Sequence, residues 1–351
     1  MIIVRNAIFI YSTELQTRQI VHDVDERREN QMNYKHVVVG GGGVLGSQIA
    51  FQAAFCGFDV TIWLRSESSI GRTQPRLDEL KETYLREIEQ MANGEVSFAA
   101  GIADEDTFAK DELIARVHQA YSTIQLELDM AKAVKNADLV IESMAENTKE
   151  KIKFYETMAP LLPEKTVIVT NSSTMLPSTF AKYTGRPAKY LSLHFANTIW
   201  RNNTTEIMPQ DQTDPRYFDE IMQFANAIRM IALPVLKEKK GYLLNSMLVP
   251  FLLSGLDLYA SGVSDPESID TAWTQGTGAP KGPFQIFDTV GLNTAHNIVS
   301  QYQSVPGLFS PLLKKMMMPY NFKKMLSILE EYINEGKLGM AAGEGFYKYD
   351  K

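Results

Sequence analysis

His194 and Glu206 are the two side chains of this chain best suited to moving a proton. His194 ends the apolar run Tyr190-Leu-Ser-Leu-His194, and Glu206 follows twelve positions later (206 − 194 = 12). An imidazole titrates near neutral pH, and a carboxylate bound to its other ring nitrogen fixes the tautomer and stabilises the charged form. The pattern predicts an acid/base pair suited to interconverting an alcohol and a ketone. A structural histidine near an unrelated surface glutamate is the alternative that the pattern leaves open.

A glycine-rich turn predicts a dinucleotide site. The run Gly41-Gly42-Gly43-Val44-Leu45-Gly46 fits G-x-G-x-x-G, follows the strand-like run 37–39 and opens a helical stretch over 44–56. Such a turn lets the backbone approach a pyrophosphate, and the start of the helix offers unpaired N–H groups. We therefore expect Gly41, Gly43, Val44, Leu45 and Gly46 to bind the cofactor. A plain flexible glycine turn is the alternative.

The end of the next strand-like run bears on the choice of cofactor. NAD sites place Asp or Glu about 20 residues beyond the glycines, where it binds the ribose hydroxyls. Leu64 occupies that position here, followed by Arg65 and Ser66. A guanidinium and a hydroxyl suit the 2′-phosphate of NADP, so NADP is favoured over NAD, with Arg65 and Ser66 as its ligands. The alternative is that Arg65 only stacks on the adenine.

Polar residues also follow two further strand-like runs. Asn171 and Ser173 come after 166–170, and Glu146 comes shortly after 138–142. Ligands of open α/β sheets bind at the carboxyl ends of the strands, so we assign Asn171 and Glu146 to the cofactor and Ser173 to the catalytic site. Helix capping, or an exposed loop for Glu146, would explain the same residue types. Asn245, on an apolar helical face, points into a cleft or satisfies a neighbouring helix.

The order of apolar runs predicts the fold. Strand-like runs at 37–39, 60–64, 138–142, 166–170, 190–194 and 230–235 alternate with helical patterns, which indicates a parallel sheet flanked by helices. An insertion over roughly 66–125 contains a helical face formed by Leu77, Leu80, Tyr84, Ile88 and Met91. The fold class is therefore α/β, a doubly wound Rossmann-type sheet domain followed by an all-α C-terminal domain.

Changes of composition along the chain predict three parts. Residues 1–31 are polar and charged and form an N-terminal appendage, which we expect to be disordered or to precede a true start at Met32. Residues 32–236 form the dinucleotide-binding domain. Residues 237–351 form the helical domain, beyond the polar cluster Lys237-Glu-Lys-Lys240. The nearly continuous apolar residues between Leu243 and Leu258 predict that this domain forms a homodimer, with a core helix as the alternative.

Composition excludes several other classes of protein. The chain has 351 residues, a net charge of −7 and a pI near 5.4, so no nucleic-acid partner is expected. One cysteine and five histidines without ligand spacing predict no metal site. No apolar run approaches the roughly 18 residues of a membrane span, and no signal peptide is evident, so we expect no membrane partner and a cytoplasmic location.

Taken together, the motifs resemble the 3-hydroxyacyl-CoA dehydrogenase family, including bacterial 3-hydroxybutyryl-CoA dehydrogenases, from about Tyr34 to the C-terminus. Seven separated segments carry the resemblance: the glycine turn, Ala137-Asp-Leu-Val-Ile-Glu-Ser-Met-Ala-Glu-Asn147, Thr170-Asn-Ser-Ser173, Leu193-His-Phe-Ala-Asn197 with Glu206, Gly241-Tyr-Leu-Leu-Asn245, Gly282-Pro-Phe284 with Asp288-Thr-Val-Gly-Leu292, and Gly343-Glu-Gly-Phe-Tyr347. Such an ordered set is very specific to the family.

The resemblance implies a Rossmann domain, a helical dimerisation domain and a role in fatty acid metabolism. It also implies a catalytic pair at His194 and Glu206 and substrate contacts at Ser173 and Asn245. Trp200 and Arg201 depart from the family pattern beside the histidine, as Leu64 does in place of the usual aspartate.

The expected function is reversible hydride transfer between NAD(P) and C3 of a 3-hydroxyacyl-CoA of the 3-hydroxybutyryl-CoA type. Arg72, Arg76 and Lys81 are candidates for the CoA phosphates by position and charge. Two alternatives stay open. One is a dehydrogenase of a free hydroxy acid such as gulonate or carnitine, with Arg201 binding the carboxylate. The other is a non-catalytic nucleotide-binding scaffold, which a matched proton-transfer pair disfavours.

Overall fold

The computed structural model describes residues 34–303 and 320–349 of the chain. The chain divides into two compact units, of which the first ends at Tyr242 and the second begins at Leu243. Each unit has its own hydrophobic core, and each is described by itself below. The expected appendage over residues 1–31 lies outside the described residues.

The first unit is built on an eight-stranded sheet with the order β3-β2-β1-β4-β5-β6-β7-β8. The strands are β1 (His36–Gly40), β2 (Asp59–Trp63), β3 (Gln125–Glu127), β4 (Leu139–Glu142), β5 (Val167–Thr170), β6 (Tyr190–Phe195), β7 (Thr204–Met208) and β8 (Ile231–Pro234). The central strands are nearly continuous apolar runs because both faces of the sheet are covered. Val37 and Val39 pack into the core on one face, and Val38 packs into the core on the other.

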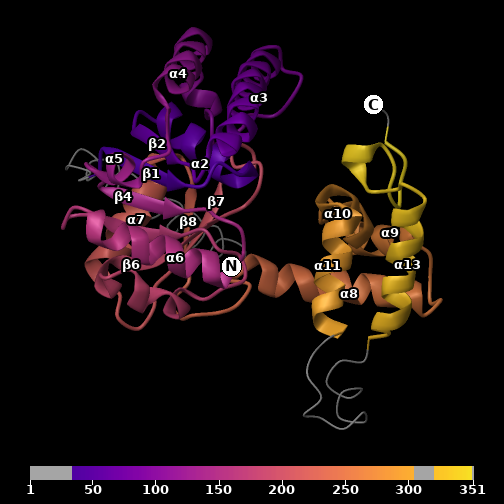
Figure 1. Cartoon of the computed structure of the whole chain (residues 1–351). Helices are drawn as coiled ribbons and strands as arrows, with labels where there is room; N and C mark the ends of the chain where they lie inside the picture. The colour runs from indigo at the N-terminus through magenta and orange to yellow at the C-terminus, as the bar shows by residue number, and fades with distance from the viewer. Residues whose placement is uncertain (1–33, 304–319, 350–351) are drawn as a thin grey trace, which may run out of the picture. The chain divides into compact units, whose positions relative to one another are not determined.

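Helices cover both faces of this sheet (Figure 1). The helices are α2 (Val44–Phe55), α3 (Glu67–Ala92), α4 (Lys110–Thr123), α5 (Met130–Val134), α6 (Thr148–Met158) and α7 (Pro215–Ala227). Residues of α2, α3, α4 and α7 belong to the core on the Val37 face, and residues of α5 and α6 belong to the core on the Val38 face. This arrangement confirms the predicted doubly wound α/β fold.

The helix predicted within the insertion is α3, and it lies beside α4 (Figure 1). The five apolar residues of its predicted face are all buried. A stripe at three- and four-residue spacing faces one side of a helix, which explains why it packs against α2 and α4. The short edge strand β3, which follows α4, was not predicted, because three residues give too little alternation to reveal a strand.

Two strands depart from the predicted parallel sheet. β7 pairs antiparallel with β6, and β8 pairs parallel with β7, so these two run opposite to the other six. Only eight residues connect β6 to β7 (203 − 195 = 8). A parallel return needs a crossover of about a dozen residues or more, so this short connection forces a hairpin. The hairpin brings the strand that carries Glu206 back alongside the strand that carries His194.

The second unit is helical, as predicted. Its helices are α8 (Leu244–Ala260), α9 (Pro266–Thr277), α10 (Pro283–Val290), α11 (Leu292–Gln303) and α13 (Phe322–Asn334). Leu252, Leu256, Phe284 and Met325 lie in its core. No helix in the described ranges is both long and apolar enough to cross a membrane.

Candidate active site

His194 and Glu206 form a buried pair across the β6–β7 hairpin. The two residues are direct partners in the antiparallel register, so their side chains share one face of the sheet. His194 Nδ1 lies 2.9 Å from Glu206 Oε2, and the exposed fractions of the two residues are 6% and 3%. A carboxylate can only accept here, so it fixes the proton on Nδ1 and leaves Nε2 as the acceptor. The alternative of an unrelated surface glutamate is therefore excluded.

The second ring nitrogen of His194, Nε2, faces Ser173. Ser173 Oγ lies 3.1 Å from His194 Nε2, and the serine is half-buried. With Nδ1 protonated toward Glu206, Nε2 accepts a hydrogen bond from the Ser173 hydroxyl in this arrangement. A substrate hydroxyl placed beside Ser173 therefore meets the one ring nitrogen that can take its proton.

Tyr242 covers the ring of His194. The two rings are stacked, with centroids 4.5 Å apart and an interplanar angle of 13°. Burial raises the pKa of the Tyr242 hydroxyl above its ordinary value, so it stays protonated and donates to the Ser172 carbonyl at 2.7 Å. Tyr242 has a φ of 50°, a conformation uncommon for a residue with a side chain. The stack and the hydrogen bond together hold the imidazole against the loop that carries Ser173.

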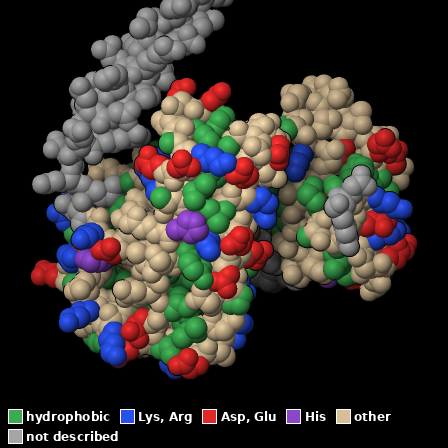
Figure 2. Space-filling view, turned by 90° about the horizontal axis from the view of Figure 1, so that it is seen from above, with side chains coloured by type: hydrophobic (Ala, Val, Ile, Leu, Met, Phe, Trp, Pro, Cys, Tyr) green, Lys and Arg blue, Asp and Glu red, His purple; other side chains and the backbone are tan. Residues whose placement is uncertain are grey.

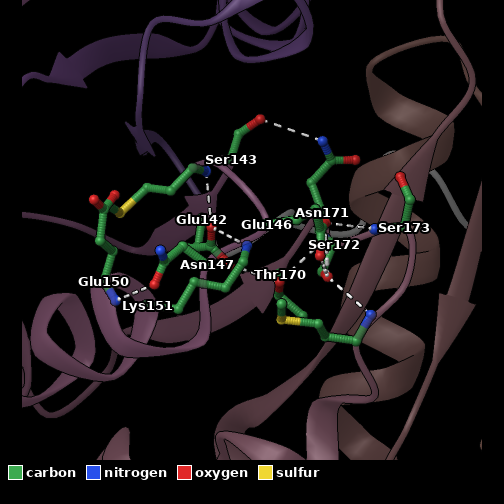
Figure 3. A network of polar contacts seen from close by, with 12 residues as sticks. Glu142, Ser143, Glu146, Asn147, Glu150, Lys151, Thr170, Asn171, Ser172 and Ser173 are labelled. Atoms are coloured by element: carbon green, nitrogen blue, oxygen red, sulfur yellow. Dashed lines mark hydrogen bonds and ion pairs between the residues drawn. The ribbon is translucent and has the colours of Figure 1, made fainter. Parts of the chain in front are cut away.

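Glu146 holds that loop from the neighbouring strand end (Figure 3). Its carboxylate accepts hydrogen bonds from Ser172 Oγ at 2.8 Å, from the Ser173 backbone N–H at 3.0 Å and from Thr174 Oγ1 at 2.9 Å. Three donors on one carboxylate fix the backbone on both sides of Ser173. Glu146 thus supports the loop that carries Ser173, and its predicted role as a cofactor ligand stays a prediction.

Asn171 joins the ends of three strands. Its side-chain oxygen accepts from the Phe195 backbone N–H at 3.0 Å, and its amide nitrogen donates to Ser143 Oγ at 3.2 Å. Asn171 follows β5, Phe195 ends β6, and Ser143 follows β4. The amide therefore ties the loop after β4 to the strand that carries His194.

A fully buried ion pair lies beneath these loops (Figure 3). Lys151 Nζ is 2.6 Å from Glu142 Oε1, and neither side chain is exposed to solvent. The same carboxylate accepts from Thr170 Oγ1 at 2.7 Å, from Tyr155 Oη at 3.0 Å and from the Met144 backbone N–H at 2.7 Å. Burial raises the pKa of Tyr155 well above its ordinary value, so this hydroxyl stays a donor. The pair anchors the start of the loop that leads to Glu146.

The glycine turn borders a cavity of about 310 Å³. Gly41 has a φ of 115°, and a Cβ at this position would lie 2.7 Å from the Ser143 carbonyl oxygen. A Cβ at Gly46 would lie 2.1 Å from the Gly41 carbonyl oxygen, whereas one at Gly43 would meet open space. These are the roles expected of a dinucleotide turn: a tight bend, close helix packing and an open approach to the backbone. The turn therefore fits a pyrophosphate.

Three arginines also line this cavity. Arg65, Arg72 and Arg76 carry three positive charges and Glu150 carries one negative charge, a formal sum of +2 among the lining residues. Arg65 Nη1 lies 3.2 Å from Glu150 Oε2. Leu64, the residue after β2, also lines the cavity and is buried. Its side chain is apolar, so this position presents no carboxylate to the cavity.

The predicted site residues fall into two groups in the first unit. Gly41, Gly43 and Arg65 line the cavity. Ser173 contacts His194, Glu146 bonds the Ser173 backbone, and Asn171 bonds the backbone of Phe195, the residue after His194. The remaining predicted ligands flank the cavity: Val44 and Leu45 begin α2, Gly46 packs against the turn, and Ser66 is the N-cap of α3 and bonds Ser69.

Three predictions are not tested at the site by this geometry. Asn245 lies in the first turn of α8, in the second unit, so its place beside His194 stays a prediction. Arg72 and Arg76 line the cavity beside the glycine turn, and their contact with the CoA phosphates stays a prediction. Lys81 lies 5.1 Å from the centroid of the Tyr121 ring and pairs with Glu82.

The loop after β6 is fastened to α3. Trp200 Nε1 donates to Glu87 Oε1 at 3.1 Å, and Arg201 pairs with the other oxygen of the same carboxylate. The Trp200 ring also lies 5.6 Å from the Tyr84 ring. The Arg201 guanidinium is thus already engaged by a carboxylate, which weakens its assignment as the binder of a substrate carboxylate.

Four residues with a part in this geometry were not predicted: Tyr242, Glu142, Lys151 and Glu150. Tyr242 stands in a segment that carries the family resemblance, and Glu150 stands three residues after the helix-capping Asn147, but neither position reveals its partner. Residues in the described ranges form no group of three or more side chains suited to a metal ion. On the face drawn in Figure 2, basic and acidic side chains are interspersed and form no single basic field.

Several proteins are similar in sequence over most of the chain. Human mitochondrial hydroxyacyl-coenzyme A dehydrogenase is 30% identical over 315 residues, which are 90% of this chain and 91% of that protein. The probable 3-hydroxybutyryl-CoA dehydrogenase of Bacillus subtilis is 26% identical over 320 residues, which are 91% and 99%. A solved structure of a diketoreductase, described for catalysis on dicarbonyl compounds, is 43% identical, with a TM-score of 0.76 over 90% of this chain and 99% of that one.

Family models account for both units. The model of the 3-hydroxyacyl-CoA dehydrogenase NAD binding domain matches residues 36–239, and the model of the C-terminal domain of the same enzymes matches residues 241–349. These matches and the relatives confirm the resemblance inferred from the motifs: the chain belongs to the 3-hydroxyacyl-CoA dehydrogenase family.

Proposed function

We propose that this protein catalyses the reversible, NAD(P)-dependent interconversion of a 3-hydroxyacyl-CoA and the corresponding 3-oxoacyl-CoA. Held at the glycine turn Gly41–Gly46, a nicotinamide cofactor would supply or accept the hydride at C3 of the substrate. His194 Nε2 takes the proton of the 3-hydroxyl group in the oxidative direction and returns it in the reductive direction. Glu206, 2.9 Å from Nδ1, stabilises the imidazolium that forms.

The remaining site residues position the oxygen that changes. When substrate is bound, the Ser173 hydroxyl, 3.1 Å from Nε2, turns from Nε2 to donate its hydrogen bond to the developing ketone oxygen, and Asn245 is assigned a second one. The single observation that carries the proposal is the buried His194–Glu206 pair with its open nitrogen directed at Ser173. A non-catalytic scaffold has no use for such a pair.

The diketoreductase at 43% identity favours a second candidate function, the reduction of a dicarbonyl compound that carries no CoA. This candidate uses the same proton and hydride steps and differs only in the group attached to the carbonyl. It replaces the free hydroxy acids as the nearer rival, because Arg201 is engaged by Glu87.

A substrate panel separates these functions. Oxidation of NADH and NADPH is followed at 340 nm with acetoacetyl-CoA, free acetoacetate and pentane-2,4-dione as substrates. The proposed function expects acetoacetyl-CoA to have the highest kcat/KM. A higher value for pentane-2,4-dione would establish the dicarbonyl function instead, and no turnover of any of the three would reject both.

For the cofactor we propose NADP in preference to NAD. The formal charge of +2 among the residues that line the cavity suits the additional phosphate of NADP.

We expect Arg65→Ala to weaken NADPH binding by about 1.5–3 kcal/mol, the scale of a hydrogen bond to a charged group, and to leave NADH binding nearly unchanged. Fluorescence titration measures both affinities. Arg86→Ala, an exposed arginine of α3 outside the cavity lining, is the control. Equal losses for both coenzymes would mean adenine stacking.

We also propose that the chain forms a homodimer through residues after about Lys237. Met247, Leu258 and Trp273 of the second unit are 67%, 40% and 41% exposed, and large exposed apolar side chains favour a partner surface. Closed two-fold pairing is the commonest arrangement of homo-oligomers. Light scattering at micromolar concentration is expected to give twice the chain mass of 39.5 kDa. A mass matching one chain would reject the dimer.

The remaining assignments are proposals of the same kind. Residues 32–236 bind the dinucleotide, residues 237–351 serve dimerisation and substrate binding, and the location is cytoplasmic. A role in fatty acid metabolism follows only if acetoacetyl-CoA is the preferred substrate.

A further inference from the structure

Glu150 of α6 places a carboxylate in the lining of the cavity, and α6 lies outside the strand–turn–helix segment of the dinucleotide motif. It is the third residue of α6, and its backbone N–H is bound by the side chain of the N-cap Asn147 at 3.1 Å. This capping hydrogen bond fixes the backbone position of Glu150. Its carboxylate reaches Arg65, the residue that follows Leu64 at the end of β2.

This pair occupies the position where the two coenzymes differ. The residues at the end of the second strand contact the adenosine ribose, which carries a hydroxyl in NAD and a phosphate in NADP. Arg65 and Glu150 both line the cavity, and their side chains are 61% and 44% exposed. The 2′-phosphate needs the guanidinium that Glu150 now holds, whereas a neutral ribose does not compete for it.

We propose that Glu150 is a specificity-determining residue that restrains Arg65 and thereby limits the preference for NADPH over NADH. The inference rests on the proposed dinucleotide site and goes beyond it by assigning the choice of coenzyme to the contest between one carboxylate and one phosphate for one guanidinium. Removal of the carboxylate releases Arg65 for the 2′-phosphate.

Glu150→Gln tests this inference through binding alone. Gln suits the third position of a helix as Glu does, and the Asn147 cap does not involve the carboxylate, so α6 is expected to remain intact. The ratio of the NADPH Kd to the NADH Kd should fall about fivefold, the factor that corresponds to about 1 kcal/mol for a partly exposed ion pair. Titration of each coenzyme by fluorescence gives the ratio.

Two further variants make the result specific. Glu156→Gln removes a charge from an exposed position of the same helix outside the cavity lining, and the ratio should stay as in the unmodified protein. In the Arg65→Ala background, Glu150→Gln should no longer change the ratio, because the guanidinium it restrains is gone.

Each outcome has one meaning. An unchanged ratio in Glu150→Gln, or an equal change with and without Arg65, overturns the role of Glu150 and leaves the dinucleotide site in place. Failure of the unmodified protein to bind either coenzyme rejects the dinucleotide site, and with it the inference. A fivefold fall that requires Arg65 supports both.

Discussion

Replacing Glu206 with Gln is expected to lower kcat by about 10²-fold or more, equivalent to about 2.7 kcal/mol of activation free energy. Gln has nearly the shape of Glu and can still accept a hydrogen bond from Nδ1 of His194, so the protein should fold. It lacks the negative charge that stabilises the imidazolium at a position only 3% exposed, where solvent screens little. Steady-state kinetics with the substrate that the panel identifies measures the change.

A carboxylate elsewhere in the first unit provides the control for this result. Glu220 of α7 accepts a hydrogen bond from the Tyr34 hydroxyl at 2.8 Å. Tyr34 lies just before β1, so this contact is at the amino ends of the parallel strands, whereas His194 lies near the carboxyl end of β6. Glu220→Gln should therefore leave kcat within about twofold, as expected for a substitution away from the reacting groups. An unchanged kcat in Glu206→Gln would remove the pair from the mechanism.

The twelve-residue spacing of His194 and Glu206 follows from the β6–β7 hairpin. The sequence alone predicts proximity after a strand end and predicts no strand at Glu206. The structure explains the number: in an antiparallel hairpin two residues face one another when their numbers share a constant sum, and Ser192 with Met208 gives the same sum of 400 as His194 with Glu206. Three of the five residues of Thr204–Met208 are polar and do not alternate with apolar ones, so the sequence pattern does not identify β7.

The glycine turn and the strand ends were predictable because their signals are local. A dinucleotide turn requires glycine at fixed offsets within a few residues, and ligands of open α/β sheets collect at carboxyl ends of strands whatever the remaining sequence is. The turn at Gly41–Gly46, the cluster around Asn171 and Ser173, and the fold class all follow from such signals.

Contacts between distant residues could not be predicted in the same way. Tyr242 stacks on a ring 48 positions earlier (242 − 194 = 48), and Arg65 pairs with Glu150, 85 positions later. Neither residue type has a pattern that identifies its partner. Lys151 and Glu142 would be placed at the surface by their charge, because buried charges are rare unless paired. These contacts depend on how the sheet is assembled.

Replacing Lys151 with Met is expected to destabilise the first unit by about 3–5 kcal/mol, because it leaves the Glu142 carboxylate buried and without its cation. Both side chains are fully buried and 2.6 Å apart. Met fills much of the volume of the lysine chain, so the effect reports charge and not a large cavity. Urea denaturation followed by tryptophan fluorescence measures the free energy of unfolding.

Two variants distinguish an unpaired charge from a packing defect. Lys153→Met changes an exposed lysine of the same helix and should shift the free energy of unfolding by no more than about 0.5 kcal/mol. Adding Glu142→Gln to Lys151→Met removes the uncompensated charge while keeping an acceptor for Thr170 and Tyr155, so the double variant should be more stable than Lys151→Met alone. If the double variant is less stable, the loss in Lys151→Met comes from packing, and the ion pair is not what anchors the loop leading to Glu146.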